Sequence, residues 1–427
     1  MKQCILVIFV NSLMSLDYDM LKELDNFKYI ISKGTIVKEV INDYPNLRIP
    51  VSTTILTGEL PHKHGIYFDD FNVKVRRYRE KEYENIQVST ILDLFKENGN
   101  DVSVISWPVM GYSNFKYNFM DIKSTRFSDI SKGILRGSSF YMMKNIFKYS
   151  KILKLNTHPE HDNFSCILGM ELLESKKSNV IFMSFNHLDY VRRRYSKDSE
   201  QVYDALKSID KKIGDILSWC DNKNLLNNLT LSIVSNGGVY NYKNSININY
   251  AFYDNGLITC NKKWKIKDYI SYAHCNEALS FIYLKDPNNA NDYGRVKVFL
   301  EEFSKNNSSF INKVYESHEF ESYDLNNFSF VVESKPGCIF DPEINREKYI
   351  QKADLSKCAL TSKVNKSISG YSNEYENSRG IFLSYGNKVR EGVYIHRCNA
   401  VDIAPTISSF MDLDFKCSGH VIKKIKK

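Results

Sequence analysis

Apolar residues recur along the chain with two periods that alternate. A continuous apolar run at residues 5–10 predicts a central parallel strand that is covered on both faces. The next segment, 17–34, carries apolar residues at helical spacing and ends at Gly34, which fits a C-terminal cap. The same reasoning predicts helices at 88–100, 200–219 and 401–411, and strands at 101–107, 178–185, 228–236 and 379–386. Strands that alternate with amphipathic helices predict an α/β fold with a mainly parallel, doubly wound sheet.

The pattern loosens between residues 240 and 342, where short strand-like and helix-like segments are separated by polar turns. We expect a small α+β insertion or cap at 240–342 and a core domain formed by 1–239 and 343–427. In such sheets, ligands bind beyond the carboxyl ends of the strands. The candidate site therefore lies in the turns after Val10, Phe185 and Ser235, together with the loops near Arg48 and Ser369.

Net charge, cysteine content and the length of apolar runs limit the cellular compartment and the classes of partner that we expect. The 58 Lys and Arg residues against 50 Asp and Glu give a net charge of +8 that is spread along the chain, so a nucleic-acid partner is not indicated. Nine scattered cysteines without a C-x-x-C pair are typical of reduced thiols in a cytoplasmic protein. Because no apolar run is long enough to cross a bilayer, we expect a cytoplasmic protein without a membrane partner.

Two stretches carry a resemblance to a known family. The segment TGELPHKHGI, from Thr57 to Ile66, has the form T-G-x-x-P-x-x-H-G-I, and a loop that carries Asp189 precedes a long helix. Together they resemble the alkaline phosphatase superfamily, within it the nucleotide pyrophosphatase/phosphodiesterase (type I phosphodiesterase) branch, and the similarity covers nearly the whole chain. The resemblance implies an α/β/α sandwich in which two divalent metals, usually zinc, activate a Thr or Ser that attacks phosphorus.

Most residues that this chemistry needs are replaced. By the resemblance, only the Asp of the middle loop is retained, as Asp189. The remaining family positions hold other residue types: Asn11 for the first Asp, Arg48 for the nucleophile, Arg193 for the His that follows Asp189, Asn236 and Gly237 for the Asp-His pair, and Ser369 for the last His. We therefore predict no metal site and no cofactor, with both zinc ions of the family lost.

The replacements form a chemical pattern. Several carboxylates around a vacated metal site would repel one another, and the amides Asn11 and Asn236 remove that repulsion. Arg48 and Arg193 are expected near Asp189, where a guanidinium can substitute for metal-to-carboxylate bonding. Together with backbone N–H groups at the start of the helix after position 48, they form a predicted anion-binding site for a phosphate, sulfate or carboxylate, to which Asn11, Asn236 and Ser369 also belong.

Other candidate residues are weighed against structural roles. His187, on the same loop as Asp189, is the candidate for acid–base work, with a structural role as the alternative, and Tyr371 is a further candidate catalytic residue. His64 belongs to the frame loop, where a turn-stabilising hydrogen bond is expected. We predict a surface loop at 158–161 and a solvated Arg192.

Three functions stay open. The first is a metal-independent, degenerate phosphodiesterase-like protein, a pseudoenzyme that binds an anionic small molecule without hydrolysing phosphodiesters. The second is a repurposed transfer or condensation enzyme of a biosynthetic pathway that uses Arg48, His187, Asp189 or Tyr371. The third is a weak residual metal-dependent phosphodiesterase or phosphatase anchored on Asp189. A protein partner or a homo-oligomer is also left open.

Overall fold

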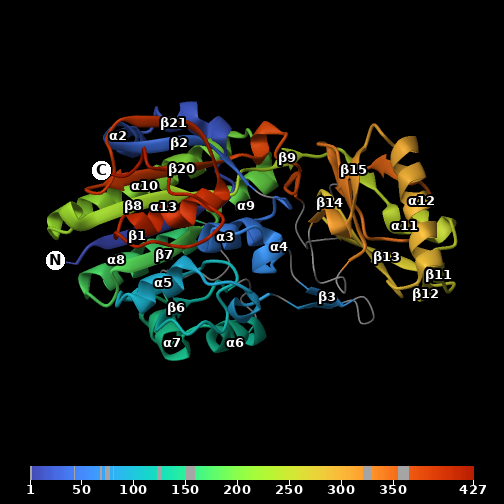
Figure 1. Cartoon of the computed structure of the whole chain (residues 1–427), viewed down its shortest axis with the longest axis horizontal. Helices are drawn as coiled ribbons and strands as arrows, with labels where there is room; N and C mark the ends of the chain where they lie inside the picture. Colours follow the sequence, from blue (N-terminus) through green and yellow to red (C-terminus); the bar gives the residue numbers. More distant parts are fainter. Residues whose placement is uncertain are drawn as a thin grey trace.

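Two units of different architecture make up the chain. The computed structural model describes residues 2–42, 44–67, 70–72, 77–79, 81–122, 127–150, 159–320, 328–353 and 365–427. A larger unit is built on an eight-stranded sheet, and a smaller unit with its own sheets lies to one side of it (Figure 1). The smaller unit is formed by residues from the yellow and orange part of the chain, so it is an insertion between parts of the larger one.

The eight-stranded sheet is mainly parallel. All neighbouring strands run parallel except β20, which is antiparallel to both of its neighbours. Strand β1 lies in the middle of the sheet, and later strands are added on both sides of it. This arrangement confirms the predicted doubly wound α/β class. In spatial order the strands are β21 (Val393–Asn399), β2 (Gly34–Ile41), β20 (Gly380–Gly386), β8 (Leu229–Val234), β1 (Cys4–Val10), β7 (Val180–Phe185), β5 (Val102–Ile105) and β6 (Tyr117–Phe119).

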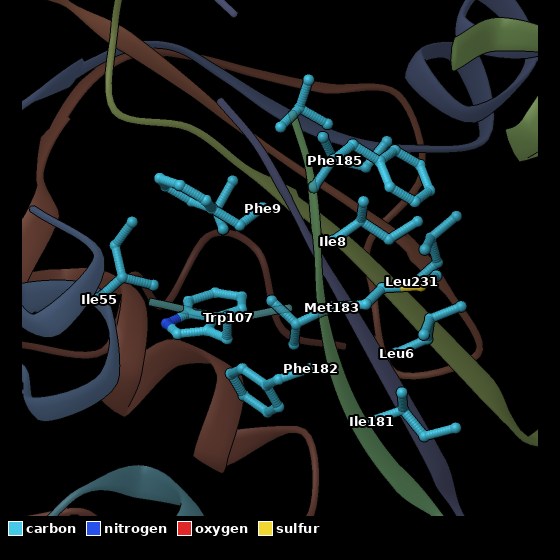
Figure 2. Close-up of a cluster of buried hydrophobic side chains, with 14 of the residues drawn as sticks. Leu6, Ile8, Phe9, Ile55, Trp107, Ile181, Phe182, Met183, Phe185 and Leu231 are labelled. Carbon is cyan, nitrogen blue, oxygen red and sulfur yellow. The ribbon is translucent and has the colours of Figure 1, made fainter. Parts of the chain in front are cut away.

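The core is densest around the central strands. Every residue of β1 is buried, as its continuous apolar run predicts for a strand covered on both faces. The ring of Trp107 lies 5.3 Å from the ring of Phe9 and 5.3 Å from that of Phe182, between the sheet and the helix that carries Ile55 (Figure 2). Burial of this many aromatic and branched side chains is what fixes the strand ends, and with them the loops of the site.

Helices cover the sheet in two groups. In one group α2 and α8 both contact α10, and in the other α3, α5 and α13 contact one another. The helices of the larger unit are α1 (Tyr18–Leu21), α2 (Asp25–Lys33), α3 (Arg48–Thr57), α4 (Pro61–His64), α5 (Ile91–Glu97), α6 (Phe127–Arg136), α7 (Ser139–Lys148), α8 (Glu160–Glu174), α9 (His187–Tyr195), α10 (Glu200–Asn222) and α13 (Ile403–Ser409). The helix predicted at 17–34 is interrupted between Leu21 and Asp25, and Gly34 is extended and already begins β2.

The smaller unit has a separate apolar core. Its elements are β10 (Asn244–Ile246), α11 (Ile248–Asp254), β11 (Ile258–Cys260), β12 (Ile266–Tyr269), β13 (Ser271–Asn276), β14 (Leu279–Leu284), α12 (Ala290–Asn306), β15 (Ile311–Glu316), β16 (Phe330–Ser334), β17 (Cys338–Phe340) and β18 (Ile350–Lys352). Because β18 pairs with β10, this unit continues past residue 342, where the cap was expected to end. The short strands β9 (Tyr240–Asn241) and β19 (Ser367–Ile368) pair beside its two connections to the larger unit.

A hairpin of β3 (Asp70–Asn72) and β4 (Arg77–Arg79) extends from the region after α4 (Figure 1).

Among the residues that the structure describes, every helix is too short or too polar to cross a bilayer.

Candidate functional site

Three strand ends bring predicted site residues together. Ser12 follows β1 with a positive φ of 65°. Its backbone N–H donates to the Oδ1 atom of Asn236, which follows β8, at 3.0 Å, and its hydroxyl donates to Asp189, which follows β7. Because parallel strands end at the same edge of the sheet, three segments far apart in sequence meet here.

Asp189 stands on a helix, not on the predicted loop. Helix α9 begins at His187, and the carboxylate of the buried Asp162 accepts hydrogen bonds from the backbone N–H groups of Asn186 and His187 at 2.9 and 3.1 Å. A carboxylate at this position stabilises the positive end of the helix dipole. The helix places Arg193 one turn after Asp189, so that the two side chains face each other.

Arg193 joins the larger unit to the smaller one. Its Nε atom donates to both carboxylate oxygens of Asp189 at 2.9 and 2.8 Å. One terminal nitrogen donates to the carboxylate of Glu277, and the other donates to the hydroxyl of Ser369 at 3.1 Å. Ser369 in turn donates its backbone N–H and its hydroxyl to Glu277 at 2.7 and 2.8 Å. We call Asp189, Arg193, Glu277 and Ser369 the Arg193 cluster.

Electrostatics hold this cluster in its charged form. Burial alone would lower the pKa of Arg193, but the attraction of Asp189 and Glu277 outweighs it, and the pKa is raised above its ordinary value. The exposed fraction of the Arg193 side chain is 17%, and those of Asp189 and Glu277 are 16% and 21%. All guanidinium nitrogens are therefore engaged within the protein, and little of the positive charge faces solvent.

The loop after β8 is closely packed. Gly237 has a φ of 74°, and a Cβ atom there would lie 2.2 Å from the backbone oxygen of Ser378. A Cβ atom at Gly238 would lie 2.1 Å from the side chain of Met14. Asn11 is buried nearby at the end of β1, and its Oδ1 atom has no hydrogen-bond partner among the described residues. The surrounding atoms therefore leave no room for a side chain at Gly237 or Gly238.

Arg48 has a different environment. It is the first residue of α3, and a terminal nitrogen of its guanidinium lies 3.9 Å from an oxygen of Asp121, beyond the end of β6. Its Nε atom is buried and has no hydrogen-bond partner in the described part of the chain. Among the described residues, Arg48 forms an ion pair with Asp121 and no hydrogen bond or ion pair with Asp189. The expected pairing with Asp189 is therefore made by Arg193 and not by Arg48.

Asp121 also contacts a buried histidine. Its other carboxylate oxygen lies 3.3 Å from the Nε2 atom of His161. The prediction of a surface loop at 158–161 is wrong for His161, which is buried in α8, because helix α8 begins directly after Pro159. His158 lies outside the described residues. Arg48, Asp121 and His161 form a second polar group, which we call the Arg48 group.

The remaining predicted residues have structural surroundings. Tyr371 is 1% exposed and donates its hydroxyl to the backbone oxygen of Cys338 at 2.9 Å, and burial raises its pKa far above the ordinary value. His64 accepts a hydrogen bond at Nδ1 from the backbone N–H of Ile66 at 3.1 Å, as expected for the frame loop, and burial lowers its pKa to about 3. His187 is half-buried at the start of α9.

Sequence reasoning missed three charged residues. Glu277 stands in the turn between β13 and β14, with a φ of 58°, and no motif marks it. Asp121 follows a strand of three residues that the apolar pattern did not reveal. Arg192, expected in solvent, is fully buried and donates to Asp17 at 2.6 Å. For the pairing of Asp189 with Arg193, the sequence does carry a signal, because the two residues are four positions apart. Using that signal requires the segment to be predicted as a helix, which it is in the structure.

The residues present do not fit a two-zinc centre. Within the described ranges, no group of three or more His, Cys, Asp or Glu side chains is placed to hold a metal ion. Asp189 accepts hydrogen bonds from the Ser12 hydroxyl and from Arg193, whose Nε atom contacts both carboxylate oxygens. A protonated guanidinium cannot ligate zinc.

Comparisons with known proteins agree with this fold. The family model for type I phosphodiesterase / nucleotide pyrophosphatase matches residues 5–334. Murine ectonucleotide pyrophosphatase/phosphodiesterase 5, solved both alone and as an inactive variant in complex with AMP, is similar at a TM-score of 0.67 and 15% identity, covering 100% of each chain. The human protein of the same name gives a TM-score of 0.66 at 17% identity and covers 98% of this chain and 96% of its own. No curated protein matches this sequence.

Proposed function

Because this chain belongs to the type I phosphodiesterase / nucleotide pyrophosphatase family, we propose that it is a metal-independent member that binds an anionic small molecule and does not hydrolyse phosphodiesters. The observation that carries the first part is the Arg193 cluster. A guanidinium held by Asp189 and Glu277 takes the place of a metal ion at the only family ligand that the sequence keeps. The absence of hydrolysis follows from Arg48 at the nucleophile position, because a guanidinium stays protonated at neutral pH.

The second part of the proposal concerns Arg48. Each guanidinium nitrogen of Arg193 already donates within the protein. Among the described residues, Arg48 makes a single ion pair at 3.9 Å, and its side chain is 29% exposed. The guanidinium stands at the first residue of α3, where backbone N–H groups of the first turn also favour an anion. We therefore assign the anion contact to Arg48, and not to both arginines as the sequence suggested.

The absence of hydrolysis is tested with metal and substrate. Protein purified without chelators is analysed for bound metal and is incubated with bis(p-nitrophenyl) phosphate and added Zn²⁺ or Mn²⁺. We expect no stoichiometric metal and no release of nitrophenolate above the buffer rate. Metal-dependent turnover that copurifies with the protein would refute a non-hydrolytic role and would favour a residual phosphodiesterase.

Anion binding is tested by thermal shift and calorimetry. AMP, the ligand named for the murine relative, and inorganic phosphate are the probes. We expect a concentration-dependent rise in melting temperature that Arg48→Ala abolishes. Arg390→Ala is the matched control, because Arg390 is exposed and follows the end of β20 that lies at the opposite edge of the sheet. An unchanged response in Arg48→Ala, or no response of the wild type to either probe, would contradict the assignment.

A further inference from the structure

Helix α7 carries apolar residues on a face that does not pack against the protein. One side of this helix, with Met142 and Tyr149, packs into the core of the larger unit. On the opposite side, Phe140 and Phe147 are each 79% exposed and Met143 is 41% exposed. These three residues are three and four positions apart, so they form one stripe along the helix. Surface helices normally present polar residues in this place.

The apolar surface continues onto neighbouring segments. Leu135 of α6, which contacts α7, is 67% exposed, and Tyr112, whose backbone N–H donates to the oxygen of Arg136 at the end of α6, is 59% exposed. Of the twelve exposed large hydrophobic side chains among the described residues, five lie between 112 and 147. We call Tyr112, Leu135, Phe140, Met143 and Phe147 the α7 face. Clustered exposure of this kind marks an interaction surface.

Basic residues accompany the α7 face. The two helices α6 and α7 contain four basic residues, Lys132, Arg136, Lys144 and Lys148, against the single acidic residue Asp129. A pocket of about 440 Å³ adjoins the first turn of α7, and Phe140, Tyr141 and three lysines line it: Lys116, Lys144 and Lys177. Its acidic residue, Glu171, is held by Lys148 at 2.8 Å and by Tyr149 at 2.6 Å.

This combination fits a lipid surface better than a folded partner. Phe140 and Phe147 are each 79% exposed, although Phe140 also borders the pocket, and separate projecting rings suit insertion between lipid chains. The helix lies at the outer margin of the molecule, so a planar surface can reach it (Figure 1). Lysines beside such rings attract anionic head groups. The expectation of no membrane partner rested on the absence of a spanning segment, which does not address binding in the interface plane.

We propose that the α7 face docks on a membrane containing anionic phospholipid, with Phe140, Met143 and Phe147 entering the interface and Lys116, Lys144 and Lys177 contacting phosphate groups. This inference goes beyond the proposed function, because these residues lie on α7 and around β6, apart from the Arg193 cluster and the Arg48 group. Docking through the α7 face would hold the protein at a membrane surface and would not require a membrane-spanning helix.

The experiment is co-sedimentation of the full chain with phosphatidylcholine vesicles, prepared with and without phosphatidylglycerol. We expect binding to the anionic vesicles and little to the neutral ones. The double variant F140S/F147S should lower the bound fraction roughly tenfold, and K116E/K144E/K177E should abolish the preference for phosphatidylglycerol. The matched control is V298S/Y394S, which removes two exposed apolar side chains, 54% and 51% exposed, on α12 and β21.

Thermal melting of each variant tests whether the protein still folds. We expect folding to be retained, because every substituted apolar side chain is exposed. Failure of the wild type to bind anionic vesicles would overturn the proposal, as would binding by F140S/F147S at the wild-type level or an equal loss in the control. A dimer in light scattering that F140S/F147S dissociates, without vesicle binding, would assign the face to a second copy of the chain and would also overturn it.

Discussion

Arg193 and Arg48 stand at positions where the family resemblance predicts a histidine ligand and the nucleophile, and the protein surrounds them differently. Arg193 donates to Asp189, Glu277 and Ser369, while Arg48 makes a single ion pair at 3.9 Å with Asp121 among the described residues. The side chain of Arg48 is 29% exposed, against 17% for Arg193. The guanidinium of Arg193 is therefore part of the scaffold, whereas that of Arg48 makes fewer contacts with the residues that the structure describes.

The difference shows that two arginines at predicted site positions need not have the same role. A guanidinium whose three nitrogens all donate to two carboxylates and a serine contributes chiefly to the stability of the fold. Arg48, whose buried Nε atom has no hydrogen-bond partner among the described residues, is the less well satisfied of the two, which is the basis for proposing it as the anion contact. Stability and binding measurements on the two arginines should therefore give opposite results.

The largest expected effect is that of Arg193→Leu. Removing the guanidinium leaves the carboxylates of Asp189 and Glu277 partly buried and without their cation, so we expect the free energy of unfolding to fall by about 3 kcal/mol. Urea denaturation monitored by circular dichroism measures it. Arg193→Lys is the control, since it keeps the charge but not the fork, and should lose less. A loss below about 1 kcal/mol for Arg193→Leu would mean that the cluster behaves as a screened surface pair.

An intermediate effect is expected for Glu277→Gln. The amide keeps the shape of the side chain but removes the charge that faces Arg193, which should cost about 1.5 kcal/mol. The double variant with Arg193→Leu should lose less than the sum of the two single changes, because both act on one network. Additive losses in the same denaturation assay would show that Glu277 stabilises the protein independently of Arg193.

The smallest expected effect is that of Arg48→Met on stability. Its one long ion pair should contribute no more than about 0.5 kcal/mol to the free energy of unfolding, so the denaturation midpoint should hardly move. The same variant should lose the thermal response to AMP and phosphate. If Arg48→Met were as destabilising as Arg193→Leu, the two arginines would share a structural role and the comparison would fail.

Most of the larger unit's fold could be predicted from the sequence, because helices and strands are indicated by apolar patterns within short segments. The apolar run of β1 and the helical spacing of α10 follow from short segments, and both elements are present within a few residues of their predicted positions. The strand β2 was not predicted, since it directly continues a helical pattern at Gly34 without a polar break. Tertiary packing against β20 and β21 selects the strand there.

The site was only partly readable. Asn11, Asp189, Arg193, Asn236 and Ser369 could be placed near one another, because strand ends of a parallel sheet converge. Glu277 comes from the turn of a hairpin in the smaller unit, and its partner Arg193 is 84 positions away. Nothing in a single sequence specifies how an inserted unit is oriented on its core, so this partner and the separation of Arg48 from Asp189 could not be derived.

The close packing at Gly237 limits which side chains this loop can carry. A histidine placed there would bring a Cβ atom to 2.2 Å from the Ser378 oxygen and would need a φ of 74°, which side chains other than glycine tolerate poorly. The histidine that the family resemblance predicts at this position would therefore strain the main chain. Engineering a metal ligand here would require the loop after β8 to be rebuilt first.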